Sequence, residues 1–119
     1  MRTFAIGLIV VLATTAVPMA HHGLAAFDRT SKVTLEGTVT DFHFVTPHAV
    51  VEFEVKDDTG RIQTWQAEMT NPKNLKGWTA TSLEAGDVVR VTGYRVKSGA
   101  LFVWVTELSS SNGMKLRGA

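Results

Sequence analysis

Two adjacent histidines, His21 and His22, follow Ala20 where an N-terminal apolar segment gives way to polar sequence. If a peptidase cuts after Ala20, His21 becomes the first residue, and its α-amine and ring Nδ1 can chelate one metal ion together. The imidazole of His48 and the carboxylate of Glu68 extend this pair to a mixed nitrogen and oxygen ligand set. Nitrogen-rich sites of this kind suit Cu(II), which heads the divalent affinity order. The predicted metal site comprises His21, His22, His48 and Glu68, with copper as its candidate ion.

Three aromatic residues near expected strand ends, Phe42, Phe44 and Trp78, form a second candidate site. Small barrels of the OB type bind extended ligands across one sheet face, and these rings are suited to line such a groove. The remaining histidine, His43, is interpreted as a structural or surface residue. Its odd spacing from His48 places the two on opposite strand faces, unless the proline between them resets the alternation.

No catalytic constellation is evident. The chain contains no G-x-S-x-G, no H-E-x-x-H and no glycine-rich phosphate loop. Glu52 and Glu54 share one strand face, but a solvated strand surface accounts for such a pair. Cysteine is absent, which removes thiol nucleophiles, thiolate ligands and disulfides. We therefore expect a protein that is not an enzyme.

Residues 1–20 have the features of a secretory signal peptide, with one arginine followed by the ten-residue apolar run 4–13. Such a run fits the hydrophobic part of a signal peptide and is too short to span a bilayer. Cleavage after Ala20 places Pro18 at the −3 position, where a small residue is usual. Cleavage after Ala16 fits that rule better and leaves both histidines internal. We expect a periplasmic or secreted protein, with no membrane association after cleavage.

The charge balance argues against a nucleic-acid partner. The chain of 119 residues has 12 Lys and Arg against 11 Asp and Glu, and residues 1–20 contain one arginine and no acidic residue. The remaining segment is therefore electrically balanced, whereas sequence-independent nucleic-acid binding depends on neutralising phosphates. Its length is enough for one small domain.

The first expected strand starts at Val33, where apolar and polar residues begin to alternate. Gly37 occupies an apolar position, where a strand can bend sharply or admit another backbone. The apolar phase then slips to Phe42 and Phe44, which predicts a bulge near Asp41. A long, kinked first strand is what a small barrel requires.

The next two strands are expected over 48–56 and 61–69, joined by a turn that ends at Gly60. A three-residue loop with Gly60 in the left-handed conformation pairs Asp57 with Arg61. This register forms one apolar face, in which three residues of the first strand oppose three of the second: Ala49, Val51 and Phe53 against Met69, Ala67 and Trp65. On the other face Val50 lies opposite Glu68, so His48 and Glu68 become diagonal neighbours with Cβ atoms about 7–8 Å apart.

A helical connection follows, with Asn71 as its N-cap, Pro72 at its first position and Gly77 at its end. Further strands are expected over 88–96 and 100–108. Three strands, a short helical connection and two strands predict an all-β fold, a five-stranded OB-like Greek-key barrel. The expected organisation is a signal peptide at 1–20, an N-terminal segment at 21–32, the barrel at 33–108 and a tail at 109–119. Asn112-Gly113 can fold that tail into a short terminal hairpin.

Several of these motifs together resemble a family of short exported bacterial proteins, known only as a domain of unknown function (DUF6152). The resemblance covers most of the chain in the right order: His21-His22-Gly23-Leu24-Ala25-Ala26-Phe27-Asp28, Val33 to Thr40, Thr46-Pro47-His48, Trp65 with Glu68, Gly77-Trp78 with Ser82-Leu83, and Gly86 to Gly93. It implies a periplasmic or secreted OB-like domain without an established activity. The motif positions carried over are His21, His22, His48, Trp65, Glu68 and Trp78.

Two departures from the family pattern concern the predicted metal site. Pro18 replaces the usual small residue before the cleavage site, and Thr46 replaces the asparagine that precedes Pro-His. Two functions are compatible with these residues. The first is an exported binding module for an unknown ligand or envelope protein. The alternative is a periplasmic copper-binding protein that uses the N-terminal histidines with His48.

Overall fold

The computed structural model describes residues 24–117, which form six β-strands and two short 3₁₀ turns. The all-β class is therefore confirmed. In chain order the elements are η1 (Leu24–Ala26), β1 (Phe27–His43), β2 (Val50–Lys56), β3 (Ile62–Glu68), η2 (Pro72–Asn74), β4 (Val88–Val96), β5 (Phe102–Ser110) and β6 (Lys115–Arg117).

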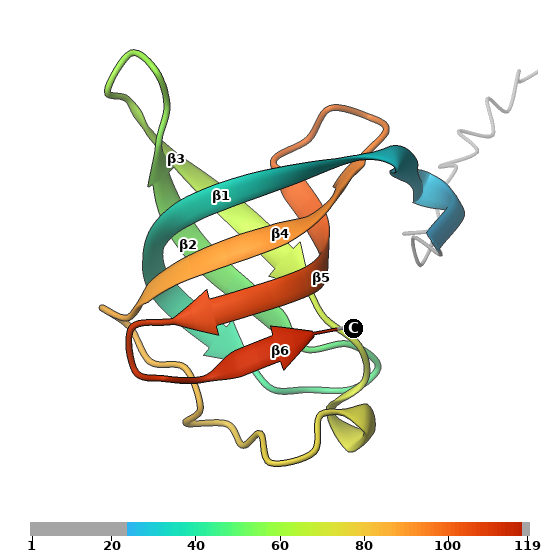
Figure 1. Ribbon diagram of the computed structural model, residues 1–119, viewed down its shortest axis with the longest axis vertical. Helices are drawn as coiled ribbons and strands as arrows, with labels where there is room; N and C mark the ends of the chain where they lie inside the picture. The colour runs from blue at the N-terminus through green and yellow to red at the C-terminus, as the bar shows by residue number, and fades with distance from the viewer. Residues whose placement is uncertain (1–23, 118–119) are drawn as a thin grey trace, which may run out of the picture.

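The strands belong to one sheet that closes into a ring (Figure 1). Along the sheet the order is β3-β2-β1-β4-β5-β6, and a parallel pairing of β3 with β5 joins the two sides. Five strands thus enclose the core, while β6 extends the sheet beyond β5. The order of three strands, a helical turn and two strands agrees with the prediction, and the OB-like character of the ring stays a prediction.

The long strand β1 takes part in both halves of the ring. It pairs with β4 through residues up to Thr38 and with β2 from Thr38 onward, and it curves strongly between them (Figure 1). A Cβ added at Gly37 would collide with the carbonyl oxygen of Glu54, so this position admits only glycine without a shift. The expected bulge is also present, because the pairing slips between Val39 and Asp41.

The β2–β3 hairpin has the predicted register. The Asp57 amide donates to the carbonyl oxygen of Arg61 at 2.9 Å, and Gly60 has a φ of 81°. Val51 consequently pairs with Ala67. Inward-facing residues of β2 and β3 then meet those of β1, β4 and β5, which buries one apolar core inside the ring.

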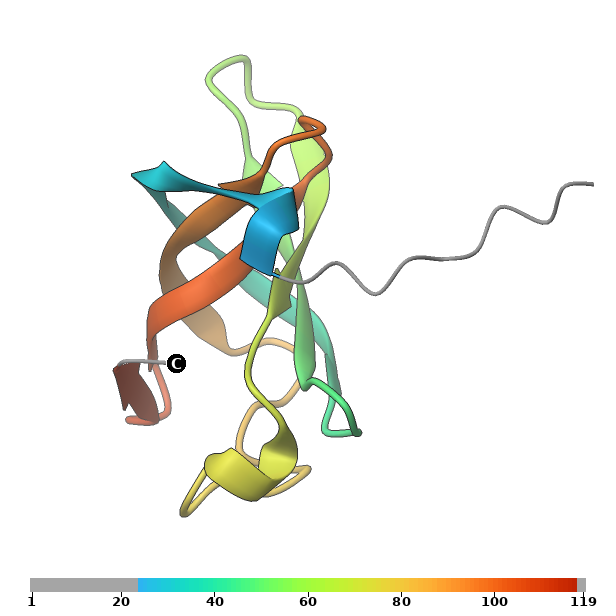
Figure 2. The same cartoon turned by 90° about the vertical axis from the view of Figure 1, so that its right-hand side faces the viewer.

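The connection between β3 and β4 is less helical than expected. Asn71 accepts a hydrogen bond from the Lys73 amide at 3.0 Å, and Pro72 starts the turn as predicted. The turn ends at Asn74, three residues before Gly77. Leu75 leaves the helical conformation and is buried in the core, so core packing stops the helix early. The connection covers one end of the ring (Figure 2).

Several strand limits differ from the expectation, and β2 and β3 are slightly shorter than expected, over Val50–Lys56 and Ile62–Glu68. β1 begins at Phe27 instead of Val33, because Phe27 already pairs with Val96 on β4. The polar residues between Phe27 and Lys32 form an irregular part of the same strand. β5 runs two residues later than expected, over Phe102–Ser110. The chain then turns at Gly113 into β6, which pairs antiparallel with β5 and forms the short terminal hairpin that the sequence allowed. Within residues 24–117 no helix has the length and apolar character needed to cross a membrane.

Candidate functional site

The structure brings together two predicted ligand residues, His48 and Glu68. Val50 on β2 pairs with Glu68 on β3, and His48 precedes Val50 by two residues. From this position His48 Nδ1 contacts Glu68 Oε1 directly. The side chain of His48 is 34% exposed, whereas that of Glu68 is only 12% exposed. A largely buried carboxylate thus has an imidazole as its partner at the surface of the ring.

Trp104 completes the surroundings of this pair. It lies beside Glu68 through the parallel pairing of β3 with β5, and its ring meets the His48 ring edge-on, with centroids 5.3 Å apart. A neutral imidazole that donates its Nδ1 proton to a carboxylate keeps its lone pair on Nε2. Carboxylates that hold histidine in this way are common behind metal-bound imidazoles. Glu68 is therefore placed to orient His48 and not only to act as a ligand.

The first described part of the chain lies against the same tryptophan. The ring of Phe27 is 6.1 Å from that of Trp104 and 5.9 Å from that of Phe102. The Lys97 amide donates to the carbonyl oxygen of Ala26 at 2.8 Å, which holds η1 beside the end of β4 (Figure 2). His21 and His22 lie outside the described residues.

The three residues of the predicted groove also come together. The ring of Phe42 lies 5.8 Å from that of Phe44 and 6.1 Å from that of Trp78. Trp78 is only 8% exposed and belongs to the core, whereas the two phenylalanines are half-buried and pack against it. The accessible surface of this aromatic cluster therefore comes mainly from Phe42 and Phe44.

An open surface groove of about 380 Å³ lies elsewhere, where β1 bends away from the end of β2. Its lining includes two exposed apolar residues, Ile62 and Val88, and the charged residues Glu36, Glu54 and Lys56. The sequence analysis did not identify this groove. The groove forms because β1 pairs with β2 only from Thr38 onward. The part of β1 before Gly37 pairs with β4 instead and leaves the end of the β2–β3 hairpin.

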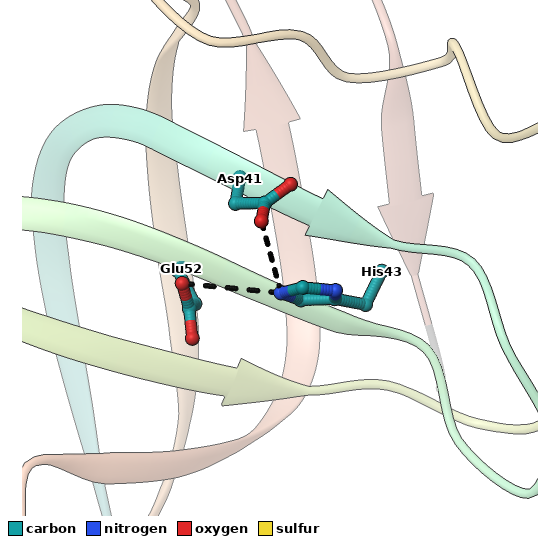
Figure 3. A group of neighbouring side chains, drawn as sticks. All are labelled: Asp41, His43 and Glu52. Carbon is teal, nitrogen blue, oxygen red and sulfur yellow. Dashed lines mark ion pairs between the residues drawn. The ribbon is translucent and has the colours of Figure 1, made fainter.

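A second titratable cluster, Asp41, His43 and Glu52, also escaped the sequence analysis (Figure 3). His43 Nε2 is 3.2 Å from Asp41 Oδ2 and 3.9 Å from Glu52 Oε2. The bulge in β1 causes this meeting, because it places Asp41 directly opposite Glu52 and keeps His43 on the same face. The slip of apolar phase near Asp41 is the sequence signal for this cluster, because it predicts the bulge that brings Asp41 opposite Glu52.

The spacing of His43 and His48 left two possibilities, opposite faces or a common face after a reset at the proline, and the structure shows a common face. His43 pairs with Val50, and Val50 pairs with Glu68, so all three project from one face. The stretch between β1 and β2 is not strand, and strict alternation therefore does not hold across it. The open alternative, a reset near Pro47, is the one realised.

A family model described as a family of unknown function (DUF6152) matches residues 8–104. The curated proteins contain no match to the chain. Among solved structures, the crystal structure of the ZRD-deleted mutant of TiaS in complex with agmatine is similar, with 21% sequence identity and a TM-score of 0.46. The aligned part covers 68% of this chain and 21% of that one. Because the family model spans most of its length, the chain belongs to the DUF6152 family of unknown function.

Proposed function

We propose that this protein is an exported binding module that holds a copper ion at the surface of its barrel, between the N-terminal histidines and His48. Export rests on the signal-peptide features of residues 1–20, and the compartment is the periplasm or the exterior. The ligands are His21, with its free α-amine after cleavage, His22 and His48. Glu68 orients the ring of His48 or joins it as an oxygen ligand.

The observation that carries this proposal is the contact between His48 Nδ1 and Glu68 Oε1. A solvated strand histidine has no need of a buried carboxylate, whereas a metal-binding imidazole gains basicity and a fixed orientation from one. With Nδ1 engaged, Nε2 is the nitrogen left to bind a metal ion. A single imidazole does not retain copper tightly, so further ligands have to reach the same place.

The packing of Phe27 places the start of β1 in the neighbourhood of His48. Phe27 contacts Trp104, and Trp104 contacts His48. His21 lies three residues before Leu24, the first described residue, and an extended chain covers at most about 10 Å over that length. The proposal requires His21 and His22 to reach His48 over this length from a β1 start that packs on Trp104.

Copper fits this set better than the other common ions. The α-amine and three imidazoles provide nitrogen ligands, cysteine is absent, and the oxygen ligands are too few for calcium or magnesium. Among divalent first-row ions, copper binds such ligands most strongly.

The test is copper binding by the protein purified from the compartment to which it is exported. Intact mass establishes whether the chain starts at His21, and electron paramagnetic resonance of one equivalent of Cu(II) counts the coordinated nitrogens. We expect a His21 start, at least two coordinated nitrogens and a loss of at least one nitrogen in His48→Ala. Glu68→Gln keeps the shape of the side chain and should weaken copper binding about 10-fold.

Two results would overturn the proposal. One is a start at Val17, after cleavage at Ala16, with no copper retained. The other is a nitrogen count that does not change in His48→Ala, which leaves at most an isolated N-terminal chelate. Glu107→Gln is the matched control for Glu68→Gln, because it removes an exposed carboxylate outside the proposed site.

A second candidate function, binding of a non-metal ligand or an envelope protein, is favoured by the groove beside Gly37. Ile62 is 62% exposed there although it is a large apolar residue, and Val88, also exposed, lines the same groove. An apolar fluorescent dye should bind the wild type, and Ile62→Lys should abolish that binding. Val45→Lys removes an equally exposed apolar residue outside the groove lining and serves as the control.

A further inference from the structure

We infer that Asp41, His43 and Glu52 form a second, independent metal site, which takes a divalent first-row transition ion such as Zn²⁺. The site would use one imidazole nitrogen and two carboxylate oxygens, a harder ligand set than that of the proposed copper site. It does not depend on signal cleavage, because all three residues lie on β1 and β2.

The spacing of the three ligand atoms suits a small ion. Zinc binds nitrogen and oxygen ligands at about 2.0–2.2 Å, and tetrahedral geometry then places two ligands about 3.4 Å apart. His43 Nε2 is 3.2 Å from Asp41 Oδ2 and 3.9 Å from Glu52 Oε2. All three ligand atoms lie within 4.8 Å of one another. Small rotamer adjustments bring these distances to tetrahedral values, and Figure 3 shows both carboxylates beside the His43 ring.

Groups outside the cluster hold each carboxylate by its other oxygen. The Phe42 amide donates to Asp41 Oδ1 at 2.9 Å, and Gln66 Nε2 donates to Glu52 Oε1 at 3.1 Å. These hydrogen bonds leave Asp41 Oδ2 and Glu52 Oε2 directed at His43 Nε2. Metal-ligating carboxylates are oriented by outer hydrogen bonds of this type, and such partners change metal affinity about 10–100-fold.

The backbone contributes rigidity and accessibility. Asp41 and Glu52 are directly paired across β1 and β2, so the strand ladder sets their separation before any ion arrives. The side chain of Asp41 is 56% exposed and that of Glu52 is 32% exposed, which leaves the site open to solvent. Three protein ligands on an open surface leave a fourth position for water or for a ligand from another molecule.

The experiment is a titration of the full chain as purified with Zn²⁺ in a calorimeter, repeated with Co²⁺, whose visible absorption reports its coordination. We expect a site that His43→Ala removes and that Glu52→Gln weakens at least 10-fold. Gln66→Ala deletes only the outer hydrogen bond and should weaken zinc binding about 10-fold. Glu54→Gln, two residues along the same strand and face, is the matched control and should leave the affinity unchanged.

The outcomes separate this site from the proposed copper site. Zinc binding that persists in His48→Ala but disappears in His43→Ala supports the inference, even if copper binding fails altogether. Zinc binding that disappears in His48→Ala and persists in His43→Ala overturns it. Absence of zinc binding at millimolar concentration also overturns it. Because Asp41 and His43 are exposed, circular dichroism should show all variants folded.

Discussion

Replacement of Gly37 by alanine tests the close approach of β1 and β2 in the ring of strands. A Cβ at this position would collide with Glu54 O and lie 3.0 Å from both Glu54 C and Phe53 Cδ2. The obstacle is backbone that pairs β1 with β2 next to Thr38, and it cannot swing aside as a flexible side chain can. Relief of the collision has to move one strand relative to the other, at the place where β1 passes from one half of the ring to the other.

The expected loss follows from these contacts. Forcing an extra carbon into a packed region costs about 1–3 kcal/mol, and an immovable backbone obstacle belongs to the upper part of that range. Alanine regains about 0.4–1 kcal/mol by restricting the unfolded chain. The net loss is about 1–2.5 kcal/mol, which lowers the unfolding midpoint of a domain of this size by about 4–20 °C.

The assay is chemical and thermal unfolding of wild type and variant, followed by circular dichroism. Gly99→Ala is the matched control, because Gly99 has a φ of +83° but no atom within 4 Å of the added Cβ. Its cost should come from backbone strain alone, about 1 kcal/mol. If Gly37→Ala is no more destabilising than Gly99→Ala, the close approach of β1 and β2 is not required and the reasoning is refuted.

Three further predictions concern the start of β1, an acidic turn and the histidine–carboxylate pair. Phe27→Ala should cost about 3–5 kcal/mol in thermal unfolding, because the ring is buried, and a loss below about 1 kcal/mol would contradict its role in fastening β1. The Thr59 hydroxyl, aided by backbone amides, lowers the pKa of Asp57 below its ordinary 3.8 despite the opposing effect of burial. The stabilisation is therefore present above about pH 4 and is lost as pH falls through the lower folded pKa, so urea midpoints should drop more between pH 5 and pH 2 in wild type than in Asp57→Asn. His48→Ala leaves the Glu68 carboxylate without its partner and should lower the free energy of unfolding by about 1–3 kcal/mol at pH 7. The double variant with His48→Ala and Glu68→Gln should lose less, and urea unfolding measures both.

The β2–β3 hairpin shows what short-range pattern can predict. The turn is closed within five residues by Asp57, Gly60 and Arg61. Only one register places the apolar residues of β2 opposite the apolar residues of β3 on the same face of the sheet. Because side chains alternate with a period of two, that register also placed Glu68 beside the expected position of His48. The contact between these two residues follows directly from it.

The cluster of Asp41, His43 and Glu52 shows where the same reasoning stops. The bulge was predicted from the shift of apolar phase, but its effect on the polar face depends on which residue of β2 lies opposite Asp41. That register is set across a non-strand connection between His43 and Val50, where side-chain alternation does not apply. Counting residues from His43 to His48 therefore left two possible faces open, and the connection around Pro47 decides between them.

By itself the sequence determined the all-β class, the order of the elements, the β2–β3 register and Gly37 as a point where β1 can bend or admit another backbone. Each of these depends on alternation or turn chemistry over a few residues. Only the tertiary structure decided the parallel pairing of β3 with β5, the packing of Phe27 on Trp104 and the meeting of Asp41 with Glu52. These contacts join segments far apart in the chain or across irregular connections. Their geometry results from the whole core packing at once, which no local period encodes.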